Sequence, residues 1–385
     1  MKAAHTLNFV VSGQGRRVVF VHGVGASLES WEGVVSQLGD RYRCLRYDLR
    51  GHGNSDKTPG PYSLDLFVDD LRALAASLGW TSFHLVGFSL GGLIVQAFAL
   101  RYPVLVKSLV IVSSVGGRTA EEQERVCQRA RTLLTGGASA HMQNSVERWF
   151  TDEFRAAHPE VVQQRVQRSL RNDPASYAAA YQVLAESDLI DQLHGVQAPA
   201  LVMTGEEDGG STPRMAHAMA GRIPNARAVI LPRLKHSVLL EAPERVAEQI
   251  GAFIEDVERQ DASSDAVFER GLAARRAVLG DEYVDRAMAG VDDFNRKFQH
   301  MVTAYCWGEC WGDDTLSPRE RSLLNLGMIA ALGKMHEFEL HLRGAVRNGI
   351  DKQELAAVIQ QITVYCGVPV GVDCMRTANA VFKNI

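Results

Sequence analysis

The stretch Gly87-Phe88-Ser89-Leu90-Gly91 decides the fold of the first part of this chain. It has the form G-x-S-x-G between an apolar run and a helical pattern, so its glycines permit a sharp strand-to-helix turn that presents the Ser89 hydroxyl above a sheet. The backbone N–H of Leu90, at the start of that helix, then faces the oxyanion of an acyl-transfer reaction. An ordinary glycine-rich turn is the alternative, and the strand before the motif disfavours it.

A second motif upstream supports the same interpretation. His22-Gly23-Val24-Gly25 directly follows the apolar run 17–21, and the backbone N–H of Val24 is a candidate for the second oxyanion donor. His22 itself, and His52 in the turn RGHG, are interpreted as structural residues rather than as catalytic bases.

A serine nucleophile needs a base, and the base needs an acid that orients it. His236 lies in a loop after a late predicted strand and before a helix, and Asp208 follows the apolar run ALVMTG by three residues. The order serine, aspartate, histidine is that of α/β-hydrolases, so Ser89, Asp208 and His236 are predicted to form a catalytic triad. Glu206 and Glu207 are the alternatives to Asp208, which is favoured because it lies at the tip of the loop.

Apolar runs and helical patterns alternate over residues 1–255, as in a mostly parallel sheet whose strands are covered on both faces. The runs expected to be strands are Arg17–His22, Tyr42–Tyr47, Phe83–Gly87, Leu109–Ser113, Ala200–Gly205 and Ala226–Leu231. Residues 117–195 interrupt the alternation because they hold helical patterns without a good strand. The predicted fold of residues 1–255 is therefore an α/β-hydrolase with a helical cap at about 117–195.

The pattern changes near residue 256. Residues 256–266 (DVERQDASSDA) are charged or small and polar, which is typical of a linker. Residues 267–385 then hold helical patterns and no strand, so they are predicted to form an all-α domain. Its expected helices are Phe268–Leu279, Glu282–Ala289, Asp293–Trp307, Pro318–Leu332, Glu337–Asn348 and Lys352–Cys366.

Length, charge and composition exclude several classes of protein. A chain of 385 residues is long enough for two cores, and its net charge of −4 argues against a nucleic-acid partner. The N-terminal residues lack the apolar core of a signal peptide. No apolar stretch approaches the roughly 18 residues of a membrane span, so a cytoplasmic location without a membrane partner is expected. The six cysteines form no CxxC pair and are interpreted as buried, reduced thiols rather than as metal ligands.

Three phrases of the first domain are more specific than the nucleophile motif: RYDLRGHG (46–53), PGPYS (59–63) and RWFTDEF (148–154). They resemble 3-oxoadipate enol-lactonases of aromatic catabolism, although HGVG replaces the Asn-Ser-Leu-Gly-like segment that those enzymes often have. The resemblance implies hydrolysis of a lactone that carries an acetate arm. Arg148 could hold that carboxylate and Trp149 could contact the ring. The alternative is that Arg148 is solvated and Trp149 packs the cap onto the sheet.

Five segments of the last third give a second resemblance: GLAARRAVLGD (271–281), YCWGECW (305–311), SPRERSLLNLGMIAALG (317–333), EFELHLRGAVRNG (337–349) and VYCGVP (364–369). Together they are similar to 4-carboxymuconolactone decarboxylases. Alkylhydroperoxidases of that superfamily use a CxxC pair upstream of a histidine. The corresponding positions here hold Lys334 and Glu337, so thiol redox chemistry is not expected. The resemblance implies decarboxylation without a metal or an organic cofactor, and assembly as a homo-oligomer.

His341 is the best acid–base candidate of this domain, with Glu337 one turn earlier on the same helix face. Without the resemblance, a surface ion pair would be the better interpretation; with it, we expect the two residues to be catalytic. Arg343 and Tyr365 are weaker candidates for substrate contact. The stretch His336–His341 is not a zinc motif, because its histidines are five residues apart and lie about 140° apart around a helix.

The two resemblances support each other because the product of the decarboxylase is the lactone that the hydrolase would open. We therefore expect a bifunctional enzyme that converts 4-carboxymuconolactone to 3-oxoadipate, two steps of the protocatechuate branch of the β-ketoadipate pathway, with small lactones as partners. Two alternatives stay open: a generalist carboxylesterase or lactonase whose helical domain binds an unrelated lactone, or a helical domain that serves only for oligomerisation. Self-association is expected because the helical domain has more aromatic surface than a six-helix unit needs: Phe298, Tyr305, Trp307 and Trp311.

Overall fold

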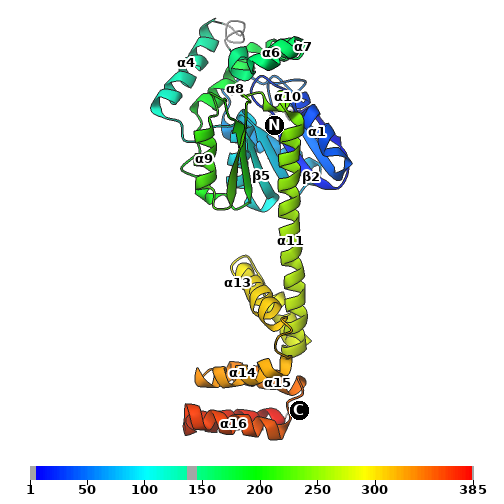
Figure 1. Cartoon of the computed structure of the whole chain (residues 1–385), viewed down its shortest axis with the longest axis vertical. Helices are drawn as coiled ribbons and strands as arrows, with labels where there is room; N and C mark the ends of the chain where they lie inside the picture. Colours follow the sequence, from blue (N-terminus) through cyan, green and yellow to red (C-terminus); the bar gives the residue numbers. More distant parts are fainter. Residues whose placement is uncertain (1–5, 137–144, 384–385) are drawn as a thin grey trace. The chain divides into compact units, whose positions relative to one another are not determined.

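The computed structural model describes residues 6–136 and 145–383. They form two compact units, Met1–Val257 and Glu258–Ile385, each with its own hydrophobic clusters. Figure 1 follows the chain through both units by colour, and each unit is described by itself below.

The first unit is built around a seven-stranded sheet in the order β1-β3-β2-β4-β5-β6-β7. Its strands are β1 Phe9–Ser12, β2 Arg16–Val21, β3 Tyr42–Tyr47, β4 Phe83–Phe88, β5 Val106–Val112, β6 Ala200–Gly205 and β7 Ala226–Leu231. All neighbours are parallel except β1, which pairs antiparallel with β3. The six predicted strands are all present, and the predicted fold class, an α/β-hydrolase with a mostly parallel sheet, is confirmed.

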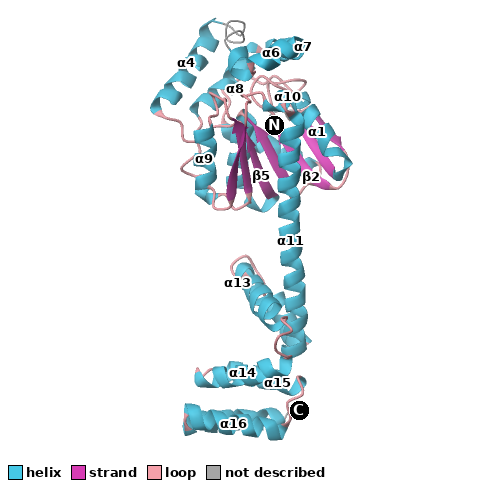
Figure 2. Ribbon diagram, in the orientation of Figure 1, coloured by secondary structure: helices cyan, strands magenta, loops and turns pink. Residues whose placement is uncertain are grey.

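Helices cover both faces of this sheet (Figure 2). Side chains of one strand alternate between the faces, so Val19 and Val21 join one core cluster while Val18 and Phe20 join the other. The first face carries α2 (Leu64–Ser77), α3 (Leu90–Arg101) and α9 (Pro213–Arg222). The second carries α1 (Glu32–Leu38), α10 (Val238–Glu241) and the beginning of α11 (Pro243–Leu279). Burial on both faces explains why the strands read as continuous apolar runs.

A helical insertion follows β5, as the sequence pattern predicts. It contains α4 (Ala120–Gly136), α6 (Asp152–Ala157), α7 (Pro159–Leu170) and α8 (Pro174–Glu186), and residues 145–149 are also helical. Within the described parts of 117–195 there is no strand. Val126, Ala130 and Leu133 of α4 pack against Tyr177 and Tyr181 of α8, which gives this cap a small core of its own.

The segment 256–266, predicted as a linker, is helical, and the boundary between the two units at Val257 and Glu258 falls within it. It lies inside α11, a helix of 37 residues. The segment contains no glycine or proline, and its Glu, Arg, Gln and Ala residues have good helix propensity. The polar composition of residues 256–266 excludes a buried strand, but polar residues of this kind are compatible with an exposed helix.

The second unit contains the end of α11 followed by α12 (Asp281–Ala289), α13 (Arg296–Met301), a π-helix (Val302–Trp311), α14 (Pro318–Ala331), α15 (Met335–Arg347), α16 (Lys352–Cys366) and α17 (Val368–Phe382). Its all-α character is confirmed. Its main cluster is formed by α14 to α17. Neither α17 nor the π-helix is predicted from the sequence pattern, which favours an α-helix over residues 293–307.

The π-helix lies close to the backbone of α11. A Cβ atom on Gly271 would be 2.0 Å from the Thr303 carbonyl oxygen, and one on Gly308 would be 2.3 Å from the Val267 carbonyl oxygen. Both positions therefore require glycine, and the contact fixes which face the π-helix presents to the rest of the unit. Among the described residues, no helix combines the length and the apolar content needed to cross a bilayer.

Candidate functional site

Ser89 lies at the turn between β4 and α3, with φ of 57° and ψ of −116°. A positive φ is unusual for a residue with a side chain, and it is held here by close packing around the turn. A Cβ on Gly87 would be 2.2 Å from the Gly91 carbonyl oxygen, and a Cβ on Gly91 would be 2.2 Å from the Val21 carbonyl oxygen. The two glycines of the motif are thus required by backbone contacts, as in a nucleophile turn.

Asp208 and His236 are brought together by the loops after β6 and β7. The His236 ring nitrogen Nδ1 lies 2.7 Å from Asp208 Oδ2. The other carboxylate oxygen, Oδ1, accepts hydrogen bonds from the backbone N–H groups of Gly210 (2.9 Å) and Ser211 (2.8 Å). Asp208 is buried, with 2% of its surface exposed. Because a carboxylate only accepts hydrogen bonds, His236 donates from Nδ1, and its Nε2 is left as the basic nitrogen.

The alternative acids do not reach His236. Glu206 accepts a hydrogen bond from the backbone N–H of Arg233, and both Glu206 and Glu207 are exposed. Of the three candidates, only Asp208 contacts the imidazole, as its place at the tip of the loop predicts.

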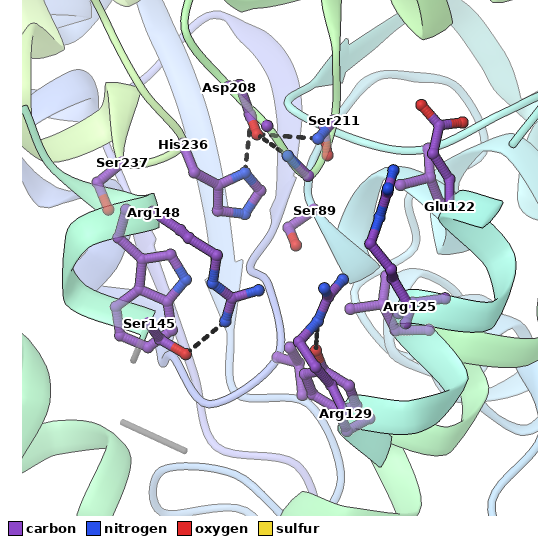
Figure 3. A pocket seen from close by; sticks show the side chains of 18 of the residues that line it. Ser89, Glu122, Arg125, Arg129, Ser145, Arg148, Asp208, Ser211, His236 and Ser237 are labelled. Carbon is purple, nitrogen blue, oxygen red and sulfur yellow. Dashed lines mark hydrogen bonds and ion pairs between the residues drawn. The ribbon is translucent and has the colours of Figure 1, made fainter. Parts of the chain in front are cut away.

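Ser89, Asp208 and His236 line one cavity of about 1010 Å³, a volume that includes its opening to solvent (Figure 3). Val24 also lines it, and a Cβ on Gly23 would be 2.9 Å from Ser89 Cβ. Leu90 is the first residue of α3, so its backbone N–H has no acceptor within the helix. The HGVG loop and the start of α3 therefore both adjoin the serine, which is the arrangement that an oxyanion site requires.

His22 and His52 are structural, as expected. Both rings are buried and meet edge to face, with centroids 5.3 Å apart. His22 Nδ1 lies 2.7 Å from the Gly23 carbonyl oxygen, and its Nε2 accepts from the N–H of Leu49 at 2.9 Å. Burial lowers the pKa of His52 to about 3, so neither ring is placed to exchange protons with a substrate.

Arg148 and Trp149 both line the cavity, and Trp149 also packs against the cap core. The two interpretations of Trp149 are therefore compatible. Arg148 donates to the Ser145 hydroxyl at 2.7 Å. Burial, followed by the nearby positive charge of Arg129, lowers the pKa of the Arg148 guanidinium, so this residue is not a solvated surface arginine.

Four further arginines, which are not predicted from the sequence, line the same cavity: Arg118, Arg125, Arg129 and Arg165. A signal for two of them exists in the sequence. Arg125 and Arg129 are four residues apart and flank the apolar positions 126, 130 and 133 of α4, so they border the buried face of this helix. Without the cap structure, nothing indicates that this border faces the serine.

In the second unit, His341 of α15 lies against Trp307 and Trp311 of the π-helix. Its ring is nearly parallel to both indoles, with centroids 6.1 and 6.2 Å away. Burial lowers the pKa of His341, and the charge of Glu337 partly opposes this effect. Its Nδ1 is buried and has no hydrogen-bond partner among the described residues. The imidazole is thus a half-buried polar group on an aromatic wall, and its Nδ1 is an unsatisfied buried polar atom.

The other candidates of this unit are less enclosed. Glu337 is exposed, one turn before His341. Arg343 pairs with Glu339 at 2.9 Å, so its charge is already balanced. Tyr365 is 79% exposed on α16, and no contact found in the described part of the chain joins it to His341.

Cysteine chemistry differs in part from the expectation. All six cysteines are free; Cys44 and Cys374 are buried, but Cys306 and Cys310 on the π-helix are exposed. The prediction of uniformly buried thiols is wrong for these two, because the π-helix directs its tryptophans, not its cysteines, toward His341. The described residues contain no cluster of His, Cys, Asp and Glu that could hold a metal ion.

Comparison with known proteins agrees with this architecture. The alpha/beta hydrolase fold family matches residues 16–243, and the carboxymuconolactone decarboxylase family matches residues 296–380. The first part is 30% identical to (E)-2-((N-methylformamido)methylene)succinate hydrolase of Acinetobacter baylyi over 253 residues, 65% of this chain and 94% of that protein. It is 31% identical to 3-oxoadipate enol-lactonase 2 of the same organism, over 54% of this chain and 77% of that protein.

The last part is 36% identical to 4-carboxymuconolactone decarboxylase of Acinetobacter baylyi over 118 residues, 31% of this chain and 88% of that protein. Among solved structures, the enol-lactonase from Burkholderia xenovorans LB400 matches with a TM-score of 0.62 and 26% identity, covering 65% of this chain and 97% of that one. The chain therefore belongs to the α/β-hydrolase family, with an N-terminal domain that resembles enol-lactonases and a C-terminal carboxymuconolactone decarboxylase domain.

Proposed function

We propose that the chain is a bifunctional enzyme that decarboxylates 4-carboxymuconolactone to 3-oxoadipate enol-lactone in its C-terminal domain and hydrolyses that lactone to 3-oxoadipate in its N-terminal domain. One observation carries this proposal: the first domain of the chain is similar to an enol-lactonase and the second to a lactone decarboxylase. The product of the first reaction is the substrate of the second.

In the hydrolase, Ser89 Oγ attacks the lactone carbonyl carbon while His236 Nε2 takes its proton. Asp208 holds the ring with Nδ1 protonated and stabilises the imidazolium that forms. The N–H groups of Val24 and Leu90 stabilise the oxyanion. Collapse of the tetrahedral intermediate breaks the acyl–oxygen bond, and the ring oxygen leaves as an enol that receives the proton from His236. Water then attacks the acyl-enzyme by the same route, and the enol becomes the ketone of 3-oxoadipate.

In the decarboxylase, the electrons of the breaking C–C bond pass through the ring double bond to the lactone carbonyl as CO2 leaves. The resulting dienolate needs a proton on carbon, and His341 is the proposed donor. Burial lowers the pKa of the free His341 side chain, whereas the negative charges of a bound substrate raise it again. Trp307 and Trp311 provide an apolar surface for the ring.

The second unit is also proposed to join copies of the chain in a homo-oligomer. Leu324, Met328 and Leu332 are spaced four residues apart along and just beyond α14 and are 54%, 55% and 73% exposed. Residues at this spacing share one helix face. An exposed apolar stripe of this kind is typical of a protein–protein interface.

The test is an assay of the purified full-length chain on both lactones and on simple alkyl esters. The proposal expects CO2 release from 4-carboxymuconolactone and ring opening of the enol-lactone, with much lower kcat/KM for alkyl esters. A generalist esterase would open simple esters as fast as the enol-lactone, and a helical domain with a purely structural role would release no CO2.

A further inference from the structure

The hydrolase cavity carries more positive charge than a substrate with one carboxylate requires. Five arginines and two carboxylates line it. Both carboxylates are already paired, Asp208 with His236 at 2.7 Å and Glu122 with Arg214 at 2.5 Å. The lining residues that the structure describes therefore leave an excess of three positive charges near the serine.

Two of the five arginines are used by the fold. Arg118 donates to three backbone carbonyl oxygens at the end of α8. Arg165 donates to the Gly25 carbonyl oxygen at 3.1 Å, and its guanidinium lies 4.5 Å from the centre of the Trp149 ring. Arg165 thus joins the cap to the HGVG loop, and Arg118 fixes the end of α8. The other three, Arg125, Arg129 and Arg148, form what we call the arginine cluster.

Arg129 and Arg148 lie close to each other and share one neutral partner, the Tyr181 hydroxyl. Arg129 Nε donates to the Tyr181 hydroxyl at 3.2 Å, and Arg148 bonds to the Ser145 hydroxyl and to Tyr181. In the view of Figure 3 both guanidinium groups lie on the side of Ser89 away from Asp208. The hydroxyl groups are neutral, so these contacts satisfy N–H donors without adding negative charge to the cavity. A carboxylate bound between the two arginines would form charge-assisted hydrogen bonds with both.

Arg125 offers a second position, one turn earlier on α4. Its ion pair with Glu121 is long, at 4.0 Å, and both side chains are mostly exposed, so this pair contributes little and is easily exchanged for another anion. Arg125 lines the same cavity as the serine. The spacing of Arg125 and Arg129 along the helix separates the two positions by about one turn, or ~5.4 Å.

We propose that the arginine cluster recognises two carboxylates of the substrate in addition to the acyl bond that is cleaved, one at Arg129 and Arg148 and the second at Arg125. This inference rests on the proposed hydrolase function and specifies its substrate class. The enol-lactone fills only the first position, so a substrate with a second carboxylate on the acyl side is preferred to an otherwise similar substrate with one.

The experiment uses three p-nitrophenyl esters with the same leaving group and none, one or two free carboxylates: the acetate, the monoester of glutaric acid and the monoester of tricarballylic acid. For the full-length chain, kcat/KM rises about tenfold or more with each carboxylate, as expected for hydrogen bonds to a charged group. Arg125→Gln removes the preference for the second carboxylate only. Arg129→Gln and Arg148→Gln each lower the preference for the first by about tenfold to a hundredfold.

The matched control is Arg131→Gln, on the same helix but paired with Glu124 and 63% exposed outside the cavity; it leaves all three rates unchanged. The readout is the ratio of kcat/KM for two of the esters, measured on one preparation of one variant. A lower fraction of active protein lowers both values equally, so the ratio still gives the preference for a carboxylate. Equal kcat/KM for one and two carboxylates, or an unaltered preference in Arg125→Gln, overturns the inference. A chain that opens the enol-lactone without this preference refutes only the inference. A chain with the preference but no enol-lactonase activity refutes only the proposed function.

Discussion

Replacing Asp208 by Asn tests the hydrolase mechanism through a single atom. The carboxylate accepts from the N–H groups of Gly210 and Ser211 at Oδ1, and from His236 and the Thr204 hydroxyl at Oδ2. An asparagine has one acceptor oxygen and one NH2 group of the same shape. If its oxygen faces the backbone, its NH2 faces His236 Nδ1. The ring then carries its proton on Nε2, where it cannot accept the proton of Ser89.

If the asparagine is flipped instead, its NH2 meets two backbone N–H donors. This orientation leaves buried donors unsatisfied and costs about 1–3 kcal/mol for each, so the first orientation is preferred and the wrong tautomer dominates. In a serine–histidine–aspartate site this change lowers kcat about 10⁴-fold, which corresponds to about 5.4 kcal/mol in activation free energy.

The assay is enol-lactone hydrolysis at neutral pH by Asp208→Asn, with Glu206→Gln and Glu207→Gln as matched controls. Both controls change a carboxylate on the same loop that does not contact His236, and they retain at least about a third of the wild-type rate. CO2 release by the second domain reports on the integrity of each preparation. A loss of less than tenfold in Asp208→Asn, or an equal loss in Glu207→Gln, would refute the assignment of the orienting acid.

Three further outcomes are expected. His341→Ala lowers CO2 release by about 10²–10⁴-fold, whereas the exposed neighbour variant His336→Ala and added EDTA do not; chelator-sensitive release or a fully active His341→Ala chain contradicts the metal-free mechanism. Since the folded pKa of His52 is about 3 and the unfolded one about 6.5, stability is retained above pH 6.5 and falls below it, by up to about 1 kcal/mol by pH 5.5. Between pH 6.5 and pH 5.5 the Tm should therefore drop less in His52→Gln than in wild type. An equal drop in the two proteins would show that protonation of His52 does not cause the loss of stability. Finally, Met328→Glu with Leu332→Glu dissociates the oligomer in light scattering; a wild-type chain that is already monomeric contradicts the proposed interface.

Much of the first unit is predictable from its sequence because its strands are buried on both faces. Continuous apolar runs locate β2 to β7, and the G-x-S-x-G turn locates the serine. The exception is β1 (Phe9–Ser12), a strand of four residues whose apolar run, Phe9–Val11, is shorter than those of the predicted strands and whose residues are exposed or half-exposed. Asp208 and His236 are predictable for a different reason: each follows a strand, and all parallel strands end at the same edge.

The arginine cluster and the π-helix are not predictable in this way. Arg125 and Arg129 belong to a helix whose polar face reads as solvated, and only the packing of α4 on α8 brings that face to the serine. The π-helix depends on the close approach of Gly271 and Gly308 to a neighbouring backbone, a contact between segments 37 residues apart. Local sequence patterns indicate which face of a helix is buried, but they do not indicate which distant segment packs against that face.

The central claim is that one chain performs two consecutive reactions at two separate sites, and it is tested most directly by feeding 4-carboxymuconolactone to Ser89→Ala. The two units have separate cores, so loss of the nucleophile leaves the decarboxylase intact. Followed by NMR, the wild type is predicted to yield CO2 and 3-oxoadipate, whereas Ser89→Ala releases CO2 at nearly the wild-type rate and accumulates the enol-lactone. Formation of 3-oxoadipate by Ser89→Ala at the wild-type rate, or the absence of CO2 from both proteins, would contradict the account.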